Sequence, residues 1–267
     1  MTAAADIAVI GGSGLYSLLD GGYEVRPDTP YGAASDAITV GEVAGRRVAF
    51  LPRHGRDHRH PPHRIPYRAN LWALRALGVR QILAPCAVGG LTAGLGPGSF
   101  VLPDQLIDRT SGRERTYVDT GAAHVNFADP YCPAGRQTVR DTAAATGIDL
   151  TGTGTMVVID GPRFSTRAES RWYAACGGTV INMTGAPEAA LARELALCYT
   201  TIALVTDLDA GVEGDHGVTL DEVFRVFKDN TERMRALLLT TIANLPGQRD
   251  CPCPAALDGL QVAFELP

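Results

Sequence analysis

The chain has 267 residues, of which 45% are hydrophobic and 20% are charged, and its formal net charge is −5. The length fits one large α/β domain, residues 1–267, better than two small ones, and the composition is ordinary for a globular enzyme. The acidic balance argues against electrostatic binding to nucleic acid or to an anionic membrane. No apolar stretch reaches the roughly eighteen residues of a transmembrane helix, and the N-terminus lacks the basic start of a signal peptide. We therefore expect a cytoplasmic protein.

Apolar runs that predict strands alternate with helical patterns along the chain. Several of the runs are continuously apolar and rich in Val and Ile, as in strands that are covered on both faces. The predicted strands cover residues 6–12, 37–43, 46–52, 81–88, 99–108, 153–160, 178–184 and 200–208. The predicted helices cover residues 67–78, 132–147, 166–178, 186–198 and 219–246. This alternation predicts an α/β fold with a largely buried sheet.

The last predicted helix has the clearest limits. Thr219 and Glu222 have the spacing of a capping box, and Pro246 ends the pattern. The apolar stripe on this helix, made of Val223, Phe227, Met234 and Leu238, predicts a face turned toward the core.

The first predicted strand ends in a glycine-rich loop, "GGSGLYS" at residues 11–17. A dinucleotide-binding turn needs a third glycine where Ser17 stands, and it opens a helix, whereas residues 18–32 predict loop and strand. The alternative is a turn whose backbone N–H groups and Ser13 hydroxyl bind a smaller anion. A plain strand-ending turn explains the glycines but not the hydroxyl among them.

Arg53 and His54 follow the end of the third predicted strand, where ligands bind in α/β sheets. Arginine also has the forked geometry that suits phosphate oxygens. The segment after them is rich in histidine, but no acidic ligand at helical spacing accompanies it, so a metal site is not predicted. We expect Arg56, Arg59 and His60 to lie in a solvated basic loop.

Two later strands also end in polar residues. Met183, Thr184 and Glu188 follow one of them, and Asp207 and Asp209 end another after five apolar residues. Acids at positions i and i+2 on a buried strand either bind a metal or recognise a ligand that offers hydrogen-bond donors. No further oxygen ligands are evident nearby for a metal.

The chain has six cysteines. Cys86, Cys132, Cys176 and Cys198 are scattered and are expected to be reduced, partly buried thiols of a cytoplasmic protein. The tail carries a "CPCP" sequence at residues 251–254 with no second cysteine pair or histidine pair beside it, so zinc is not predicted. We expect a pair of surface thiols there, with a redox role as the alternative.

Taken in order, these motifs resemble the methylthioadenosine phosphorylases, a branch of the trimeric purine nucleoside phosphorylases. The resemblance runs from about residue 6 to the C-terminus and is carried by "IGGSGL", "RHG", "YRANLWAL", "DQLIDRT", "GPRFSTRAES", "VINMTGAPEAALARE" and "TDLDAG". The pair "GPRFSTRAE" and "NMTGAPE" is the most specific part. The glycine loop is the least specific.

The resemblance implies the nucleoside phosphorylase fold, with a mixed, partly barrelled sheet between helices. It implies a homotrimer, no metal, and no cofactor other than inorganic phosphate as co-substrate. The residues implied to bind phosphate are Ser13, Arg53, His54, Thr184 and the backbone near Ala87. Those implied to bind the nucleoside are Phe164, Met183, Asp207, Asp209, Val218, Leu220, Val223 and Phe224, with His124 from a neighbouring subunit.

The implied reaction is phosphorolysis of 5′-methylthioadenosine. Asp207, with Asp209 beside it, is assigned the proton that the departing purine needs, because a carboxyl group with a raised pKa can share one. The alternatives are a purine nucleoside phosphorylase for adenosine or 6-oxopurine nucleosides, a nucleoside-binding protein without turnover, and an NAD-dependent oxidoreductase.

Three positions depart from the family pattern. Cys86 stands where many relatives have threonine near the phosphate, and Asp160 replaces a glutamate. Glu265 stands where an apolar residue usually closes the pocket around the 5′ group. We expect Glu265 to face solvent while Phe264 or Leu266 packs instead.

Overall fold

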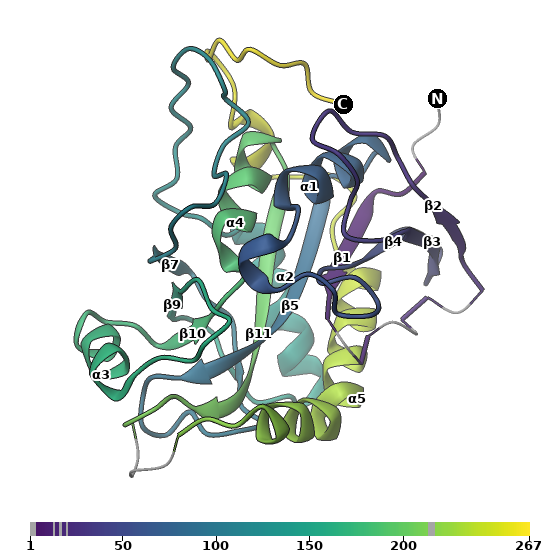
Figure 1. Cartoon of the computed structure of the whole chain (residues 1–267). Coiled ribbons are helices and arrows are strands. Elements are labelled where there is room, and N and C mark those ends of the chain that lie inside the picture. The colour runs from purple at the N-terminus through teal and green to yellow at the C-terminus, as the bar shows by residue number, and fades with distance from the viewer. Residues whose placement is uncertain (1–3, 13, 16–17, 20, 213–216) are drawn as a thin grey trace.

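The computed structural model describes residues 4–12, 14–15, 18–19, 21–212 and 217–267, and within them a mixed sheet of eleven strands is covered by helices (Figure 1). The strands are β1 Ile7–Gly11, β2 Tyr23–Val25, β3 Ile38–Val43, β4 Arg46–Pro52, β5 Gln81–Gly90, β6 Phe100–Val101, β7 Gln105–Asp108, β8 Leu150–Thr151, β9 Thr155–Val158, β10 Val180–Asn182 and β11 Cys198–Leu208. The α-helices are α1 Tyr67–Ala76, α2 Pro133–Thr146, α3 Arg167–Ala175, α4 Gly185–Glu194 and α5 Leu220–Asn244, and short 3₁₀ helices cover Pro62–Arg64 and Cys253–Ala255.

The predicted α/β alternation is confirmed. One predicted strand, residues 99–108, is divided into β6 and β7, because Pro103 between them has no N–H group for a strand ladder. The described residues of the segment after the glycine loop contain the short strand β2 and no helix, as the sequence predicts.

The long strand β5 organises the sheet. It pairs in parallel with β1 at its start and with β11 along its whole length, and its last residues pair antiparallel with β10. Because β10 runs against β5, the chain that leaves β10 is carried back toward the middle of β5. The end of β11 instead stays beside Gly89 and Gly90 at the end of β5.

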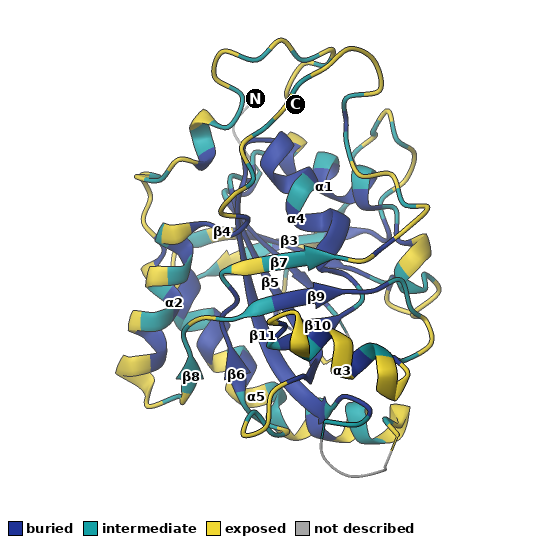
Figure 2. Ribbon diagram, turned by 90° about the vertical axis from the view of Figure 1, so that its left-hand side faces the viewer, coloured by how far each residue is buried: buried dark blue, intermediate teal, exposed yellow. Residues whose placement is uncertain are grey.

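The central strands β1, β5 and β11 are buried on both faces, as the apolar strands predict, whereas the outer strands β7 and β8 are half-buried or exposed (Figure 2). Ala8 and Ile10 of β1 belong to a core with α1 and α4, whereas Ile7 and Val9 belong to a second core with α2 and α5. This division follows from the alternation of side chains along a strand.

Helix α5 begins as predicted, because the Thr219 hydroxyl accepts a hydrogen bond from the N–H of Glu222 at 3.4 Å. Its apolar stripe is divided between two roles. Met234 and Leu238 are fully buried in the core. Val223 and Phe227, nearer the N-terminus, line the cavity described below.

The predicted location of the tail thiols is wrong. Cys253 is buried, and it packs with Cys132, Cys198 and the half-buried Cys251. The residues that surround this pair come from distant parts of the chain, so the local "CPCP" sequence did not reveal them. The predicted partial burial is also wrong for Cys176, which is exposed.

A buried ion pair joins the sheet to α4. Nε and Nη2 of Arg53 bind the two carboxylate oxygens of Glu188 at 2.8 and 3.0 Å, and the hydroxyl of Tyr199 donates to the same carboxylate at 2.7 Å. The guanidinium also donates to the carbonyls of Ile10 and Pro85. One side chain therefore connects β1, β5 and α4 to the end of β4.

We expect Glu188→Gln to lower the free energy of unfolding by about 3–5 kcal/mol, because it leaves the guanidinium of Arg53 buried without its counter-charge. The control is Asp229→Asn, which removes the exposed i,i+4 pair with Arg225 and is expected to cost about 0–1 kcal/mol. Urea unfolding of both variants measures the difference, and equal effects would contradict a structural role for the buried pair.

Candidate active site

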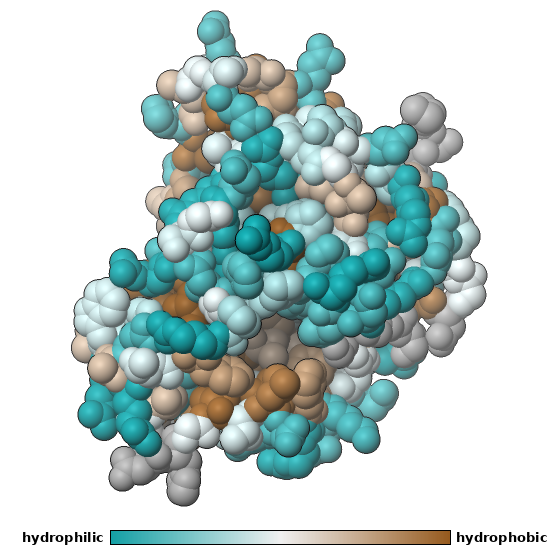
Figure 3. Space-filling view, in the orientation of Figure 1, coloured by the Kyte–Doolittle hydropathy of each residue, from teal (hydrophilic) through white to brown (hydrophobic). Residues whose placement is uncertain are grey.

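A cavity of about 490 Å³ lies where the ends of β4, β5, β10 and β11 meet the first turns of α5. Figure 3 shows it as a hollow with apolar residues along its lower rim. Its lining includes Gly12, Arg53, His54, His58, His60, Cys86, Ala87, Gly89, Phe164, Asn182, Met183, Thr184, Thr206, Asp207, Asp209, Leu220, Val223, Phe224 and Phe227. This volume is within the usual range for a small-molecule site.

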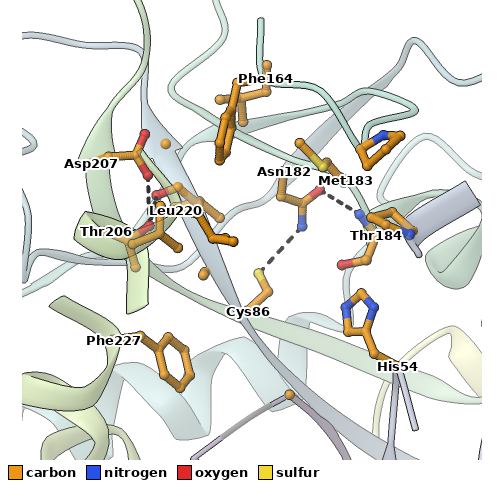
Figure 4. A pocket seen from close by; sticks show the side chains of 18 of the residues that line it. His54, Cys86, Phe164, Asn182, Met183, Thr184, Thr206, Asp207, Leu220 and Phe227 are labelled. Atoms are coloured by element: carbon orange, nitrogen blue, oxygen red, sulfur yellow. Dashed lines mark hydrogen bonds between the residues drawn. The ribbon is translucent and has the colours of Figure 1, made fainter. Parts of the chain in front are cut away.

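One end of the cavity is acidic (Figure 4). The pairing of β11 with β5 shifts between Val205 and Asp207, and such bulges commonly redirect side chains beside active sites. Asp207 and Asp209 are only 5% and 4% exposed. The Thr206 hydroxyl donates to Oδ2 of Asp207 at 2.8 Å, and the Ser170 hydroxyl donates to Oδ2 of Asp209 at 2.6 Å.

The pKa of Asp207 is raised to about 6, chiefly by burial; the Thr206 hydrogen bond opposes this shift, and the nearby carboxylates of Asp209 and Glu222 add to it. A carboxyl group with such a pKa holds a proton in about a tenth of the molecules at pH 7, far more than an ordinary aspartate, and can exchange it with a ligand.

The opposite end of the cavity contains His54 and Thr184 (Figure 4). Nδ1 of His54 lies 2.9 Å from the carbonyl oxygen of His60, and its ring stacks on His58 with centroids 4.7 Å apart. The pKa of His54 is lowered to about 4, chiefly by burial; the contact with the carbonyl of His60 opposes this shift, and the charge of Arg53 adds to it. His54 is therefore neutral at pH 7, and the Nδ1 proton is directed to the carbonyl of His60.

Arg53 reaches the cavity wall, but Nε and Nη2 are bound to Glu188 beneath it. The sequence predicted a side chain whose fork faces phosphate oxygens. In the structure these two nitrogens bind the carboxylate of Glu188 instead. The positive charge of Arg53 still lies close to this end of the cavity.

Cys86 and Asn182 lie between the two ends (Figure 4). Nδ2 of Asn182 approaches Sγ of Cys86 at 3.5 Å, and Oδ1 of Asn182 accepts from the N–H groups of Thr184 and Gly185. Burial raises the pKa of Cys86 to about 11, so its thiol is uncharged. Asn182 was not among the predicted site residues, although it stands directly before the predicted residues Met183 and Thr184.

The walls of the cavity are apolar. Phe164 lines the cavity, and so do Leu220, Val223 and Phe224 from the first turns of α5, as predicted. Leu220 and Phe224 are exposed, so this wall is open to solvent at its edge. The sequence assigned Phe227 to the core stripe alone, but it also lines the cavity.

Two of the predicted nucleoside-binding residues do not line the cavity of this chain. His124 is exposed in the long segment between β7 and α2, and Val218 is half-buried outside the lining. Ala87 lines the cavity as expected, but Ser13 lies outside the described residues. Glu265 is exposed, and Phe264 packs against Trp72 and Tyr117, as the sequence analysis expected.

Arg113, which the sequence analysis did not name, holds two loops at the cavity. Its guanidinium donates to the carbonyls of Met183 and Ala186 and to those of Ile159 and Asp160. The Asp160 carboxylate in turn accepts from the N–H and hydroxyl of Ser111. Asp160 is therefore part of this loop support and does not line the cavity.

Comparison with known proteins identifies the family of this chain. A model of the Phosphorylase superfamily matches residues 6–243. The chain is 57% identical to a purine nucleoside phosphorylase of Streptomyces coelicolor, with 98% of each chain covered, and 56% identical to an S-methyl-5'-thioadenosine phosphorylase of Mycolicibacterium smegmatis, with 98% and 99% covered. A solved methylthioadenosine phosphorylase of Schistosoma mansoni, in complex with adenine, superposes with a TM-score of 0.88 at 35% identity over 91% of this chain and 93% of that one.

The chain therefore belongs to the phosphorylase superfamily, and within it is a pentosyltransferase with the nucleoside phosphorylase fold. The family assignment excludes the NAD-dependent alternative for the glycine loop. Among the described residues, every helix is too short or too polar to span a membrane.

The raised pKa of Asp207 predicts a stability that depends on pH. The folded pKa, about 6, exceeds the ordinary value of 3.8, so the folded state holds more protons, and stability falls as pH rises from about 4 through 6. Asp207→Asn should therefore raise the free energy of unfolding at pH 8 by about 1–3 kcal/mol and change it little at pH 4.

Chemical denaturation at the two pH values measures this difference. Asp258→Asn, at an exposed position outside the cavity, is the matched control and should change stability little at either pH. An Asp207→Asn variant that is less stable than the native protein at pH 8 would show that the carboxylate is stabilised in the fold.

Proposed function

We propose that this enzyme cleaves 5′-methylthioadenosine with inorganic phosphate, giving adenine and 5-methylthioribose 1-phosphate, in purine and methionine salvage. The observation that carries the proposal is the buried carboxyl pair, Asp207 and Asp209, at one end of a cavity whose other end carries His54 and Thr184. The name of the Mycolicibacterium smegmatis relative and the adenine complex of the Schistosoma mansoni protein support it.

In this proposal the purine lies beside Phe164 with its N7 edge toward Asp207. Phosphate lies at the opposite end, near His54, Thr184 and the backbone of Ala87, with the Ser13 loop as a further donor. The ribose spans the middle of the cavity near Met183 and Asn182. The side chains of His54 and Asp207 thus act on opposite ends of the reacting bond.

The neutral form of His54 determines which phosphate oxygen it can bind. With its Nδ1 proton directed to the carbonyl of His60, Nε2 is an acceptor, so it suits a phosphate oxygen that carries a proton. The guanidinium of Arg53, close behind, adds positive charge that favours an anion at this end.

The reaction then follows from charge. The bond between C1′ and N9 breaks, the sugar becomes cation-like, and the phosphate dianion both stabilises this cation and forms the new bond to C1′. The electron pair of the broken bond goes to adenine. A proton shared with Asp207 at N7 neutralises that charge, which a carboxyl group with a pKa of about 6 can supply.

The hydrogen-bonding groups of the cavity determine which purine base the enzyme prefers. The 6-amino group of adenine is a donor and finds acceptors in Asp207 and Asp209, whereas a 6-oxo group needs a donor. A second candidate, a purine nucleoside phosphorylase for adenosine or 6-oxopurine nucleosides, is supported by the name of the Streptomyces coelicolor relative. The two acids favour the 6-aminopurine.

The 5′ substituent faces the apolar wall of Leu220, Val223 and Phe224. Burial of a methylthio group there contributes about 1–2 kcal/mol, and a hydroxyl without a partner costs a similar amount. Glu265, which could accept from a 5′-hydroxyl, is exposed and does not line the cavity. We therefore expect methylthioadenosine to be preferred over adenosine.

The test is incubation with methylthioadenosine, adenosine or inosine, with and without phosphate, followed by chromatography of the products. We expect adenine release that requires phosphate, needs no added metal or nucleotide, and is fastest for methylthioadenosine. Release without phosphate, binding without turnover, or a preference for inosine would each overturn the proposal in a different way.

Asp207→Asn is the informative variant in this assay. Turnover of methylthioadenosine should fall by about 10² or more, the size of a general-acid contribution, and the relative preference should move toward inosine. Asp258→Asn again serves as control. Unchanged rate and preference in Asp207→Asn would remove this residue from its assigned role.

The proposed function also includes the oligomeric state of the enzyme and its location in the cell. We propose a homotrimer in the cytoplasm, because His124 is exposed and does not line the cavity of its own chain, and because the apolar edge at Leu220 and Phe224 is open. A neighbouring subunit that brings His124 to this edge would close the cavity. Sedimentation should give a trimer, and His124→Ala should raise KM without changing the assembly; a fully active monomer would contradict this.

A further inference from the structure

Four cysteines meet at a place remote from the cavity. The Sγ atoms of Cys132, Cys198, Cys251 and Cys253 all lie within 4.8 Å of one another, and those of Cys198 and Cys251 are 3.5 Å apart. Three of the four side chains are fully buried. None of them lines the cavity that contains Asp207.

Three separate segments build this cluster. Cys132 is the N-cap of α2, Cys198 is the first residue of β11, and the tail supplies Cys251 and Cys253 around the last 3₁₀ helix. The backbone fixes two of them, because the N–H of Cys132 donates to the carbonyl of Tyr199 and the N–H of Cys198 donates to that of Arg80. The sulfur atoms therefore converge through the fold and not through a local turn.

We propose that Cys132, Cys198, Cys251 and Cys253 form a structural tetrathiolate site for one Zn²⁺ ion. A zinc ion with four sulfur ligands at about 2.3 Å holds those sulfurs about 3.8 Å apart, which falls between the two separations in the cluster. A donor set of sulfur alone selects soft or borderline ions and disfavours magnesium or calcium. Zinc replaces four thiol protons, which are released to solvent.

The surroundings suit the negative charge that such a site carries. Zn²⁺ with four thiolates has a net charge of −2, and Cys132 stands at the positive end of the α2 dipole, where the N–H of Gly135 donates to its sulfur at 3.4 Å. Arg249, two residues before Cys251, binds the carbonyl of Ala196 at 2.9 Å, which places its positive charge close to the same segments. Both features offset the charge of the thiolates.

The bound ion would join the C-terminal segment to the body of the enzyme. The tail reaches its 3₁₀ helix after α5 has ended, and Cys251 and Cys253 then attach it to α2 and β11. Two disulfides are the competing chemistry. They would divide the four sulfurs into separate pairs and require an oxidising environment, in contrast to the predicted cytoplasmic location.

The test uses the full-length protein, purified with a mild reductant and no chelator. Metal analysis should give one zinc per chain, and all six thiols should titrate once the protein is unfolded with a chelator. Exchange for Co²⁺ should give the intense visible bands of a tetrahedral thiolate site. Cys253→Ser should lower zinc content at least about tenfold and Tm by roughly 5 °C, whereas Cys176→Ser, an exposed thiol outside the cluster, should change neither.

A native protein without zinc but with six free thiols would overturn the proposal. Two titratable thiols and no zinc would show disulfides in its place. If Cys253→Ser fails to fold, the native protein still decides the question, because a mercurial reagent must release zinc in step with modification of the four thiols. Zinc content and thiol titration decide between these outcomes, and turnover does not, because no cysteine of the cluster lines the active cavity.

Discussion

The buried pair between Arg53 and Glu188 is the interaction on which the arrangement of the site depends. A guanidinium removed from water is stable only with a full set of acceptors, and here the two oxygens of Glu188 and the carbonyls of Ile10 and Pro85 supply them. These partners come from β1, β5 and α4. The end of β4, and with it His54, is therefore held at a fixed place relative to the strand that carries Cys86.

The cavity contains two different electrostatic environments, and the buried pair lies at one of them. At the Arg53 end, positive charge and burial keep His54 neutral, while at the far end burial and neighbouring carboxylates keep Asp207 close to half-protonated near pH 6. His54 and Asp207 are both charged less often in the folded protein than they would be in water. The cavity can therefore bind an anion at one end and a group that accepts a proton at the other. Cleavage of a glycosidic bond by phosphate requires this arrangement.

The antiparallel strand β10 explains how these ends are kept apart. Its pairing with Gly89 and Gly90 of β5 sends Asn182 and Thr184 back toward Cys86, whereas the bulge in β11 keeps Asp207 beside Gly89. In a purely parallel sheet both sets would meet at one edge. The mixed sheet therefore determines the length of the cavity as well as its composition.

The sequence by itself determined the order of strands and helices, the acidic pair at the end of β11 and the family to which the chain belongs, because these depend on local periodicity and on contiguous motifs. It also placed His54, Thr184 and Phe164 at the site. It did not reveal that Glu188 occupies the fork of Arg53, that Phe227 faces the cavity, or that Cys132 and Cys198 join the tail cysteines. Each of these depends on side chains that are distant in sequence and meet only when the sheet and helices pack, so only the tertiary structure decided them.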